Sequence, residues 1–321
     1  MRRLAVALAG AALVAFIGLR NPILHETPVA EGSDDLAVHV FLPYASPAIH
    51  YGHDGMVMVY VPAGDFLMGS TDDDRDARDD EKPQHMVYLD AYWIDKTEVT
   101  NTMFQRFVDA TGYETDAERL GSGVVFGSNQ CTWSGVFGAY WRSPEGPASD
   151  LAGRMSHPVV QVSWNDADAY CRWAGRRLPT EAEWEKAARG TDAGRYPWGE
   201  EPPAGNLVNF ADVNLGCDWA HPTQDDGYER TAPVGTFPAG ASPYGALDMA
   251  GNVWEWVADW WYSGYYTVSL RSNPTGPDTG DVRVVRGGSW DEVAGGLRSS
   301  DRGRRFPDVR SGSGGFRCVR P

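Results

Sequence analysis

Four cysteines are the residues of this chain with the widest choice of chemistry: Cys131, Cys171, Cys217 and Cys318. A thiolate can bind a soft metal ion, attack an electrophile or form a disulfide. None of the four has the close C-x-x-C spacing that zinc sites and thioredoxin-like redox motifs use. An even number of cysteines in an exported chain favours two disulfides, for which three pairings exist, and buried free thiols are the alternative.

The N-terminal segment indicates export. Two arginines after Met1 precede an uncharged, mostly apolar run that ends at Leu19. This pattern is typical of a secretory signal, and the run is shorter than the roughly 20 residues that span a bilayer. We therefore expect a signal peptide or signal anchor over 1–20, a proline-containing linker over 21–51 and a single domain over 52–321. The protein is then secreted or membrane-anchored, outside the cytoplasm, and meets a membrane only through its N-terminal segment. A buried N-terminal helix is the alternative.

The composition describes an acidic, loop-rich globule. The 321 residues include 37 Gly, 21 Pro, 13 Trp and 14 Tyr, and turn-formers beside many aromatic side chains favour short elements held together by flat rings. The formal net charge of −16 excludes broad binding to nucleic acid or to an anionic membrane. Residues 282–321 are the exception, since they carry nine arginines and four acidic residues.

Three helices are predicted from their caps and their apolar spacing. The first begins near Thr100 and the second follows Ser163. The third has Thr180 as its N-cap, with Glu183 three residues later completing a capping box, and it ends at Gly190. Turns and short strands make up the rest, so the fold class is α+β with little regular secondary structure.

Two shorter features concern the first third of the domain. Residues 56–61 and 66–68 are apolar and flank a Pro-Ala-Gly turn, which predicts a β-hairpin. The acid-rich segment 72–81 predicts a solvated loop.

Several sequence blocks occur together in a fixed order. They are VPAGDFLMG at 61–69, KTEVTN at 96–101, HPVVQVSWN at 157–165, RLPTEAEWE at 177–185, YPWG at 196–199, LDMAGNVWEW at 247–256, RGGSW at 286–290 and GFRC at 315–318. Their order and content resemble the formylglycine-generating enzyme family, also called the sulfatase-modifying factor family. The resemblance covers about 57–319 and implies a single-domain variant of the C-type lectin fold, poor in secondary structure.

The same resemblance raises the question of copper. The best-known members oxidise a cysteine of sulfatases to formylglycine, using molecular oxygen and a copper ion held by two cysteine thiolates. Counted from the Gly-Gly-Ser segment 287–289, Glu292 and Leu297 occupy the places of those cysteines. Because copper(I) is a soft ion that prefers thiolates, no copper is expected here. The iron-dependent relatives bind their metal in an additional N-terminal helical domain, for which this chain has no room.

The family pattern also implies disulfides and structural calcium. Cys171 and Cys318 match a disulfide-bonded pair of the family, which leaves Cys131 and Cys217 as the second pair. Two calcium sites of the family match positions that keep oxygen ligands, which calcium requires. The first would use Asn209, Phe210, Asp226 and Tyr228, and the second Asp248, Gly251, Val253 and Glu255. The alternative is that these acids cap turns.

A ligand pocket is expected at the family's active-site face. Its residues are Trp254, Ser289, Trp290, Glu292, Arg298 and Arg302. The indole rings could stack on a ligand while the arginines bind its carboxylate, phosphate or sulfate. Alternatively, the tryptophans belong to the core and the arginines pair with the surplus acids.

Two functional hypotheses result. In the first, the protein is a calcium-stabilised module that binds a small molecule, a peptide or a glycan, anionic or polar, and is not a copper oxidase. In the second, it is an oxidoreductase or tailoring enzyme of the formylglycine-generating or nonheme-iron type that uses a different site.

Overall fold

The computed structural model describes residues 49–52 and 54–321. The predicted signal segment 1–20 and nearly all of the predicted linker 21–51 therefore lie outside the described residues. The end of that linker range is strand β1 (Ile49–Tyr51), which joins a sheet of the domain. Within the described part of the chain, no helix has the length and apolarity needed to cross a membrane.

The elements are short, as the composition predicts. The α-helices are α1 (Asn101–Thr111), α2 (Asp116–Leu120), α3 (Trp164–Trp173) and α4 (Glu181–Arg189). The remaining strands are β2 (Val57–Val61), β3 (Gly64–Met68), β4 (His85–Leu89), β5 (Tyr92–Asp95), β6 (Ser122–Gly127), β7 (Thr132–Phe137), β8 (Trp254–Trp260), β9 (Arg283–Arg286), β10 (Arg302–Arg305), β11 (Gly314–Phe316) and β12 (Val319–Arg320). Single 3-10 turns are η1 (Asp79–Glu81), η2 (Pro238–Gly240), η3 (Tyr265–Thr267) and η4 (Ala294–Leu297).

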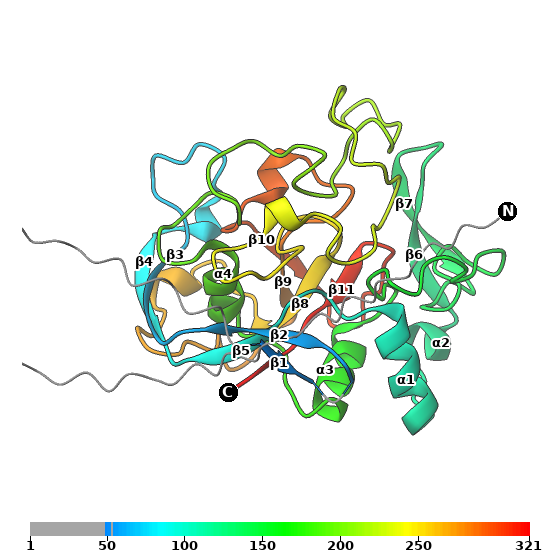
Figure 1. The fold of residues 1–321 in the computed structure, drawn as a ribbon, viewed down its shortest axis with the longest axis horizontal. Helices are drawn as coiled ribbons and strands as arrows, with labels where there is room; N and C mark the ends of the chain where they lie inside the picture. The colour runs from blue at the N-terminus through cyan, green and yellow to red at the C-terminus, as the bar shows by residue number, and fades with distance from the viewer. Residues whose placement is uncertain (1–48, 53) are drawn as a thin grey trace, which may run out of the picture. The chain divides into compact units, whose positions relative to one another are not determined.

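Two four-stranded sheets form the centre of the domain (Figure 1). The first has the order β1-β2-β5-β12, and β12 pairs antiparallel with β5 so that Val319 lies opposite Ile94. The second has the order β10-β9-β8-β11, and β11 runs parallel to β8 with Gly315 opposite Glu255. Two hairpins, β3–β4 and β6–β7, complete the strands of the described chain. The α+β fold with little regular structure is therefore confirmed.

The three predicted helices are confirmed together with their caps. The hydroxyls of Thr100, Ser163 and Thr180 each accept a backbone N–H from the first turn of the helix that follows. The carboxylate of Glu183 also accepts the N–H of Thr180 at 2.8 Å, which completes the capping box. Each such cap contributes about 1 kcal/mol. The cap at Thr180 fixes the start of α4, which packs against β3, β8 and β9.

Three details differ from the sequence-based expectations. The hairpin predicted over 56–68 is wrong, because β2 pairs with β1 and β5 whereas β3 pairs with β4. Each strand is apolar enough to form, but packing against distant segments, and not the turn between β2 and β3, determines which strands pair. Helix α2 was not expected, since it is only five residues long. The segment 72–81 is not wholly solvated, since Asp80 and Glu81 are 7% and 0% exposed.

Aromatic side chains fill the core. Four tryptophans are at most 1% exposed: Trp141, Trp184, Trp256 and Trp290. The ring of Phe104 contacts those of Trp141, Tyr170 and Phe316, with centroids between 5.3 and 6.4 Å apart. Such aromatic pairs contribute about 0.5–1.5 kcal/mol beyond the area they bury. Contacts between aromatic rings therefore supply much of the core packing in this domain, which has only short helices.

Both expected disulfides are present. Cys171–Cys318 joins α3 to the segment before β12, and both cysteines are fully buried. Cys131–Cys217 joins the turn of the β6–β7 hairpin to a distant loop, and Cys131 is partly exposed. With both bridges formed, the described residues contain no free cysteine.

Replacing Cys171 and Cys318 with serine is expected to lower the free energy of unfolding by about 2–5 kcal/mol. The bridge spans a sequence separation of 147 residues, and the two serine hydroxyls would be buried without ready partners. Equilibrium denaturation of the folded variant measures the loss. The matched variant, Cys131→Ser with Cys217→Ser, should lose less because serine at position 131 can be hydrated, and an equal or larger loss would contradict this account.

Candidate functional site

The residues matched to the family's active centre lie at the start of β8 and between β9 and η4. Ser289 is fully buried, and its carbonyl accepts the N–H of Glu292 at 2.9 Å. Trp254 is 7% exposed and lies close enough to the Glu292 carboxyl group to lower its pKa. The Ser289 hydroxyl donates to Asp291 Oδ1 at 2.6 Å. The structure therefore brings Trp254, Ser289 and Glu292 together and adds Asp291, which sequence reasoning missed.

Trp290 belongs to an aromatic core beside this centre. Its ring lies 5.4 Å from that of Phe126 and 5.7 Å from that of Trp133, between centroids. Its indole N–H donates to the Gly312 carbonyl at 3.1 Å. Trp133 in turn donates to Asp291 Oδ2 at 3.1 Å. Trp290 is 1% exposed, so it packs in the core beside the site and its ring is not accessible to a ligand.

Glu292 is the partly exposed carboxyl group of the centre. Burial first, and then the nearby carboxylates of Asp291 and Asp301, raise its pKa to about 7, while Trp254 and Arg305 act in the opposite direction. Gly296 packs against it so closely that a Cβ there would lie 2.5 Å from Glu292 Oε2. Near neutral pH this carboxyl group can therefore donate or accept a proton.

The residues present do not fit a copper site of the family type. Leu297 is fully buried in an apolar cluster with Tyr196, Val208 and Phe210. Glu292 supplies a hard carboxylate, and the sulfur atoms of all four cysteines are bound in disulfides. Copper(I) favours thiolates, so this donor set cannot reproduce a two-thiolate site.

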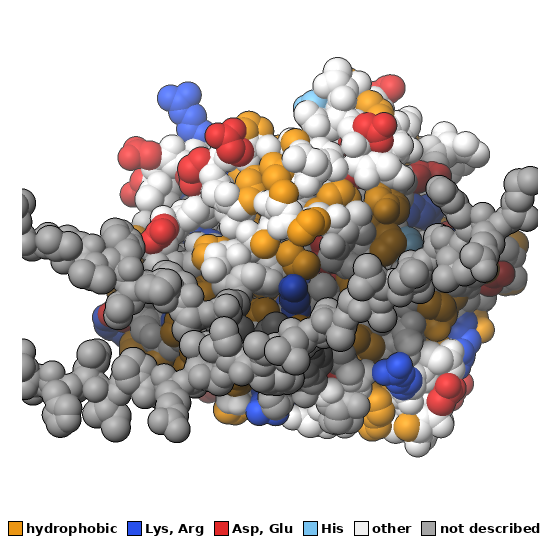
Figure 2. Space-filling model, in the orientation of Figure 1, with side chains coloured by type: hydrophobic (Ala, Val, Ile, Leu, Met, Phe, Trp, Pro, Cys, Tyr) orange, Lys and Arg blue, Asp and Glu red, His pale blue; other side chains and the backbone are white. Residues whose placement is uncertain are grey.

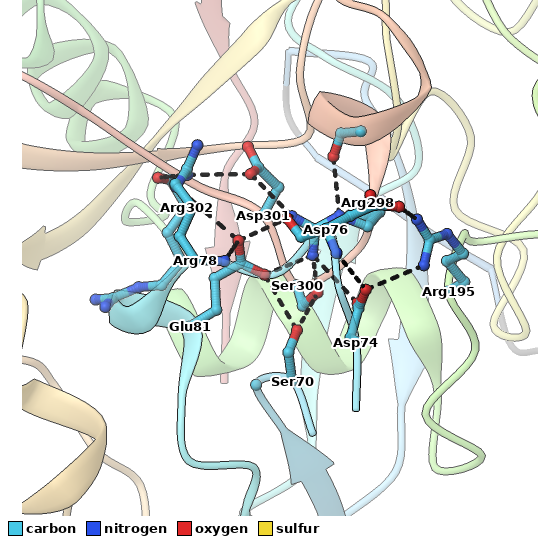
Figure 3. Close-up of polar contacts among 12 residues, drawn as sticks. Ser70, Asp74, Asp76, Arg78, Glu81, Arg195, Arg298, Ser300, Asp301 and Arg302 are labelled. Carbon is cyan, nitrogen blue, oxygen red and sulfur yellow. Dashed lines mark hydrogen bonds and ion pairs between the residues drawn. The ribbon is translucent and has the colours of Figure 1, made fainter. Parts of the chain in front are cut away.

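Arg298 and Arg302 lie in buried ion pairs rather than in a pocket, and Figure 3 shows the pair of Arg298 with Glu81. Arg298 binds Glu81 through two hydrogen bonds of 2.6 and 2.8 Å. Arg302 binds Glu181 in the same bidentate way, at 2.6 and 2.9 Å. Both arginines are at most 2% exposed. Their guanidinium groups are occupied by the protein's own carboxylates, so we do not place them at the rim of a ligand pocket.

The loop between β3 and β4 covers this ion-pair cluster. Ser70 donates to Glu81 Oε2 at 3.1 Å, and Arg78 binds Asp301 at 3.0 Å. A cavity of about 430 Å³ opens beside the cluster, and its lining includes Asp74 and Arg195, which are 3.4 Å apart. Acidic side chains are exposed over this loop in Figure 2. The segment 72–81 is thus exposed at its middle and anchored at its end.

The residues of the first expected calcium set lie next to one another, and the calcium site itself stays a prediction. Asp226 accepts the backbone N–H groups of Phe210 at 2.9 Å and of Tyr228 at 2.8 Å. Burial first, with smaller contributions from Asp212 and Asp225, raises the pKa of Asp226 to about 7, although these two hydrogen bonds lower it. Asn209 is 1% exposed, and no group of the described chain donates to its Oδ1. A buried oxygen without a partner beside a crowded carboxylate fits a bound cation.

The second expected calcium set also stays a prediction, and its residues have the following surroundings. Asp248 and Gly251 lie in the left-handed backbone region, with φ values of 56° and 70°. Val253 is fully buried next to Trp254. Glu255, however, accepts two hydrogen bonds of 2.7 Å from Arg317, so its charge is already neutralised. Among the described residues, no three His, Cys, Asp or Glu side chains converge as a metal site, so both sets depend on amide and carbonyl oxygens.

Comparison with known proteins decides the family. Residues 50–321 match the family profile described as "Sulfatase-modifying factor enzyme 1-like domain". The chain belongs to this family. It is 46% identical over 287 residues to a formylglycine-generating enzyme of Streptomyces coelicolor, covering 81% of this chain and 88% of that protein. It is 39% identical over 296 residues to the "Inactive C-alpha-formylglycine-generating enzyme 2" of Mus musculus, covering 85% and 89%.

A solved structure supports the fold. PvdO from Pseudomonas aeruginosa superposes with a TM-score of 0.67 at 29% sequence identity, covering 86% of this chain and 98% of that chain. The formylglycine-generating-enzyme fold expected from the sequence blocks is therefore confirmed. Because relatives named as active and as inactive enzymes both align along most of the chain, membership of the family leaves the reaction open.

Changing Glu81 to Gln is expected to destabilise the protein by about 3–5 kcal/mol at pH 7, because it leaves Arg298 buried without its carboxylate. Although burial raises the pKa of Glu81, hydrogen bonds from Arg298 and Arg78 lower it below 4.5 overall. The pair therefore stabilises the protein above about pH 4.5, and this contribution is lost as the pH falls further. Denaturation of wild type and variant from pH 7 to pH 3 measures a difference that should shrink.

The matched control is Asp76→Asn in the same loop, because the Asp76–Arg195 pair is exposed at 59% and 28%. Such a surface pair contributes about 0–1 kcal/mol. Equal losses in the two variants would contradict the structural role given to Glu81.

Changing Glu292 to Gln is expected to have the opposite effect. Because the folded-state pKa of Glu292 is raised from 4.5 to about 7, the ionised group costs stability as the pH rises through this range. The variant should therefore be more stable than wild type at pH 8, by about 1–3 kcal/mol, and similar to it at pH 4.5. A wild-type stability profile that Glu292→Gln leaves unchanged between these values would contradict the raised pKa.

Proposed function

We propose that this protein is an exported, calcium-stabilised binding module of the sulfatase-modifying factor family that recognises a polar or anionic ligand at Glu292 and does not oxidise cysteine. One observation carries the proposal. At the two places of the copper thiolates, the chain has a partly buried carboxyl group and a buried leucine, and it has no free cysteine with which to replace them.

The surroundings of Glu292 indicate how a ligand would be bound. Arg298 and Arg302 are engaged within the protein, whereas Arg305 faces Asp291 and Glu292 without a close ion pair and donates to Ser311 Oγ at 2.8 Å. Burial lowers the pKa of Arg305, which reflects incomplete compensation of its charge. A ligand carboxylate or sulfate would pair with Arg305, and a protonated Glu292 would donate a hydrogen bond to it. A small molecule, a peptide or a glycan can supply such a group.

Export of the protein and its binding of calcium are supported by different observations. Two disulfides are typical of proteins that fold in an oxidising compartment. The unpartnered oxygen of Asn209 and the crowded carboxyl group of Asp226 support a cation at the first set. The acidic net charge of −16 would be partly neutralised by such ions. No role for nucleic acid follows from this charge, and the only contact with a membrane would be through residues 1–20.

A second candidate function rests on the proton chemistry of Glu292. A carboxyl group with a pKa of about 7 is suited to general acid–base catalysis at neutral pH. The alternative is therefore a tailoring enzyme that uses Glu292 in place of a metal-bound cysteine. Turnover that Glu292→Gln abolishes while ligand binding persists would favour this alternative over a binding module.

The copper chemistry can be tested directly. Wild-type protein, supplied with copper(I), oxygen and a Cys-x-Pro-x-Arg peptide, is expected to form no aldehyde, as mass spectrometry would detect. The Streptomyces coelicolor formylglycine-generating enzyme is the positive control. A double variant, Glu292→Cys with Leu297→Cys, should gain copper(I) binding, whereas each single variant should not, because two thiolates are needed. Formylglycine formation by the wild type would overturn the proposal.

A further inference from the structure

A cavity of about 370 Å³ is lined entirely by polar and charged residues, and its volume is near the lower limit for small-molecule sites. The lining residues are Glu145, Arg154, His157, Glu229, Arg230 and Thr231. The lining includes neither Glu292 nor Arg305, the two residues to which the proposed function assigns ligand binding. The cavity is therefore a separate candidate for a ligand.

Two segments that are far apart in the sequence form the walls of this cavity. The first lies between β7 and α3, and the second precedes η2. The Asn101 side chain, at the start of α1, donates to the Arg154 carbonyl at 2.8 Å. The Val234 N–H donates to the Ser156 carbonyl at 3.0 Å and joins the two segments. Hydrogen bonds to the backbone therefore hold both walls in place.

Arg154 and Glu145 form an ion pair that leaves part of their hydrogen-bonding capacity unused. Arg154 Nη1 donates to Glu145 Oε1 at 2.5 Å. Within the described residues, the other guanidinium donors of Arg154 have no hydrogen-bond partner. Glu145 Oε2 is buried, and no group of the described chain donates to it. Because an unpartnered buried oxygen is costly, a further donor is expected beside Glu145.

Arg230 and Glu229 form a looser pair on the other wall. Arg230 Nε lies 4.0 Å from Glu229 Oε1, beyond hydrogen-bonding distance. Arg230 Nη2 donates to the Phe126 carbonyl at 2.9 Å, which orients the guanidinium group. The Ser128 hydroxyl donates to Glu229 Oε1 at 2.6 Å, and the Glu229 side chain is 55% exposed. Both charged groups can therefore accommodate another partner.

His157 adds no net charge to the cavity near pH 7. Burial first, and then the charge of Arg154, lowers its pKa below 6.5, while its hydrogen bond with Thr231 acts in the opposite direction. With His157 neutral, the two arginines of the lining balance the two glutamates. A simple anion would meet two carboxylates, and a simple cation would meet two guanidinium groups. A ligand that carries both charges can pair with all four groups.

We propose that this cavity binds a small zwitterion of the α-amino-acid type. The ligand carboxylate pairs with Arg154 and Arg230, and the ligand ammonium group donates to Glu145 and Glu229. The lining contains no large apolar side chain, so recognition depends on the two charged groups and favours a ligand whose own side chain is small or polar. This binding is independent of the ligand proposed for Glu292.

Glycine, acetate and methylamine form a matched set of probes, since acetate lacks the ammonium group and methylamine lacks the carboxylate. In ligand-observed NMR titrations of the full chain, up to about 50 mM of each probe, glycine should bind with a millimolar dissociation constant. Acetate and methylamine should bind at least about tenfold more weakly, because each can pair with only half of the charges. Equal binding of acetate or methylamine, or no binding of glycine, would overturn the proposal.

Substitutions on the two walls locate the site. Glu229→Gln and Arg154→Lys should each weaken glycine binding about tenfold, the first by removing a partner of the ammonium group and the second by removing the guanidinium fork. The control Asp76→Asn removes a carboxylate of similar exposure, 59% against 55%, from a different loop and should bind glycine as the wild type does. If all three variants fold and bind glycine equally, the assignment to this cavity is wrong.

Arg305→Gln separates this cavity from the centre at Glu292. Because Arg305 does not line the cavity, the variant should bind glycine as tightly as the wild type. Glycine binding that Arg305→Gln abolishes and Glu229→Gln leaves intact would place glycine beside Glu292. That result would overturn the present inference and support the proposed function.

Discussion

Buried pairs between arginine and carboxylate hold this domain together. Helix α4 carries two of the acids, since Glu181 binds Arg302 and Glu185 binds Arg286, and the arginines come from β10 and β9. The pair of Arg298 with Glu81 extends the system to the loop before β4, and that of Arg317 with Glu255 ties β8 to the segment before β12. In a fold with short strands and few helices, these pairs set the relative positions of segments that hydrogen-bonded ladders do not connect. Removing one partner of such a pair is costly because the other remains charged in the interior.

The same framework explains how the active centre of the family can change without loss of the fold. The pairs lie beside the segment 287–297 and not within it, so a change of side chain at Glu292 or Leu297 removes none of them. Glu292 occupies a position next to Trp254 and Gly296 that tolerates a carboxyl group, and Leu297 extends an apolar cluster. The chain therefore keeps the fold of its family with a carboxyl group and a leucine at these two positions.

Sequence patterns predicted the features that depend on residues close together in the chain. The caps at Thr100, Ser163 and Thr180 fixed three helix starts, because capping depends on residues three positions apart. The pairing of Cys171 with Cys318 followed from resemblance to the family rather than from spacing. The roles of Arg298 and Arg302 were not predictable, since their carboxylates lie 217 and 121 residues away.

The strand β12 has a consequence for the order in which the protein can fold. Residues 317–320 supply the buried partner of Glu255, the sulfur that bonds to Cys171 and the edge strand beside β5. Each of these contacts joins residues separated by tens to hundreds of positions, and none can form until the ribosome has passed residue 320. The outer edge of β5 and the buried charge of Glu255 therefore stay unpaired during synthesis. Folding of this domain therefore depends on contacts between residues far apart in the sequence, which are completed only at the end of synthesis.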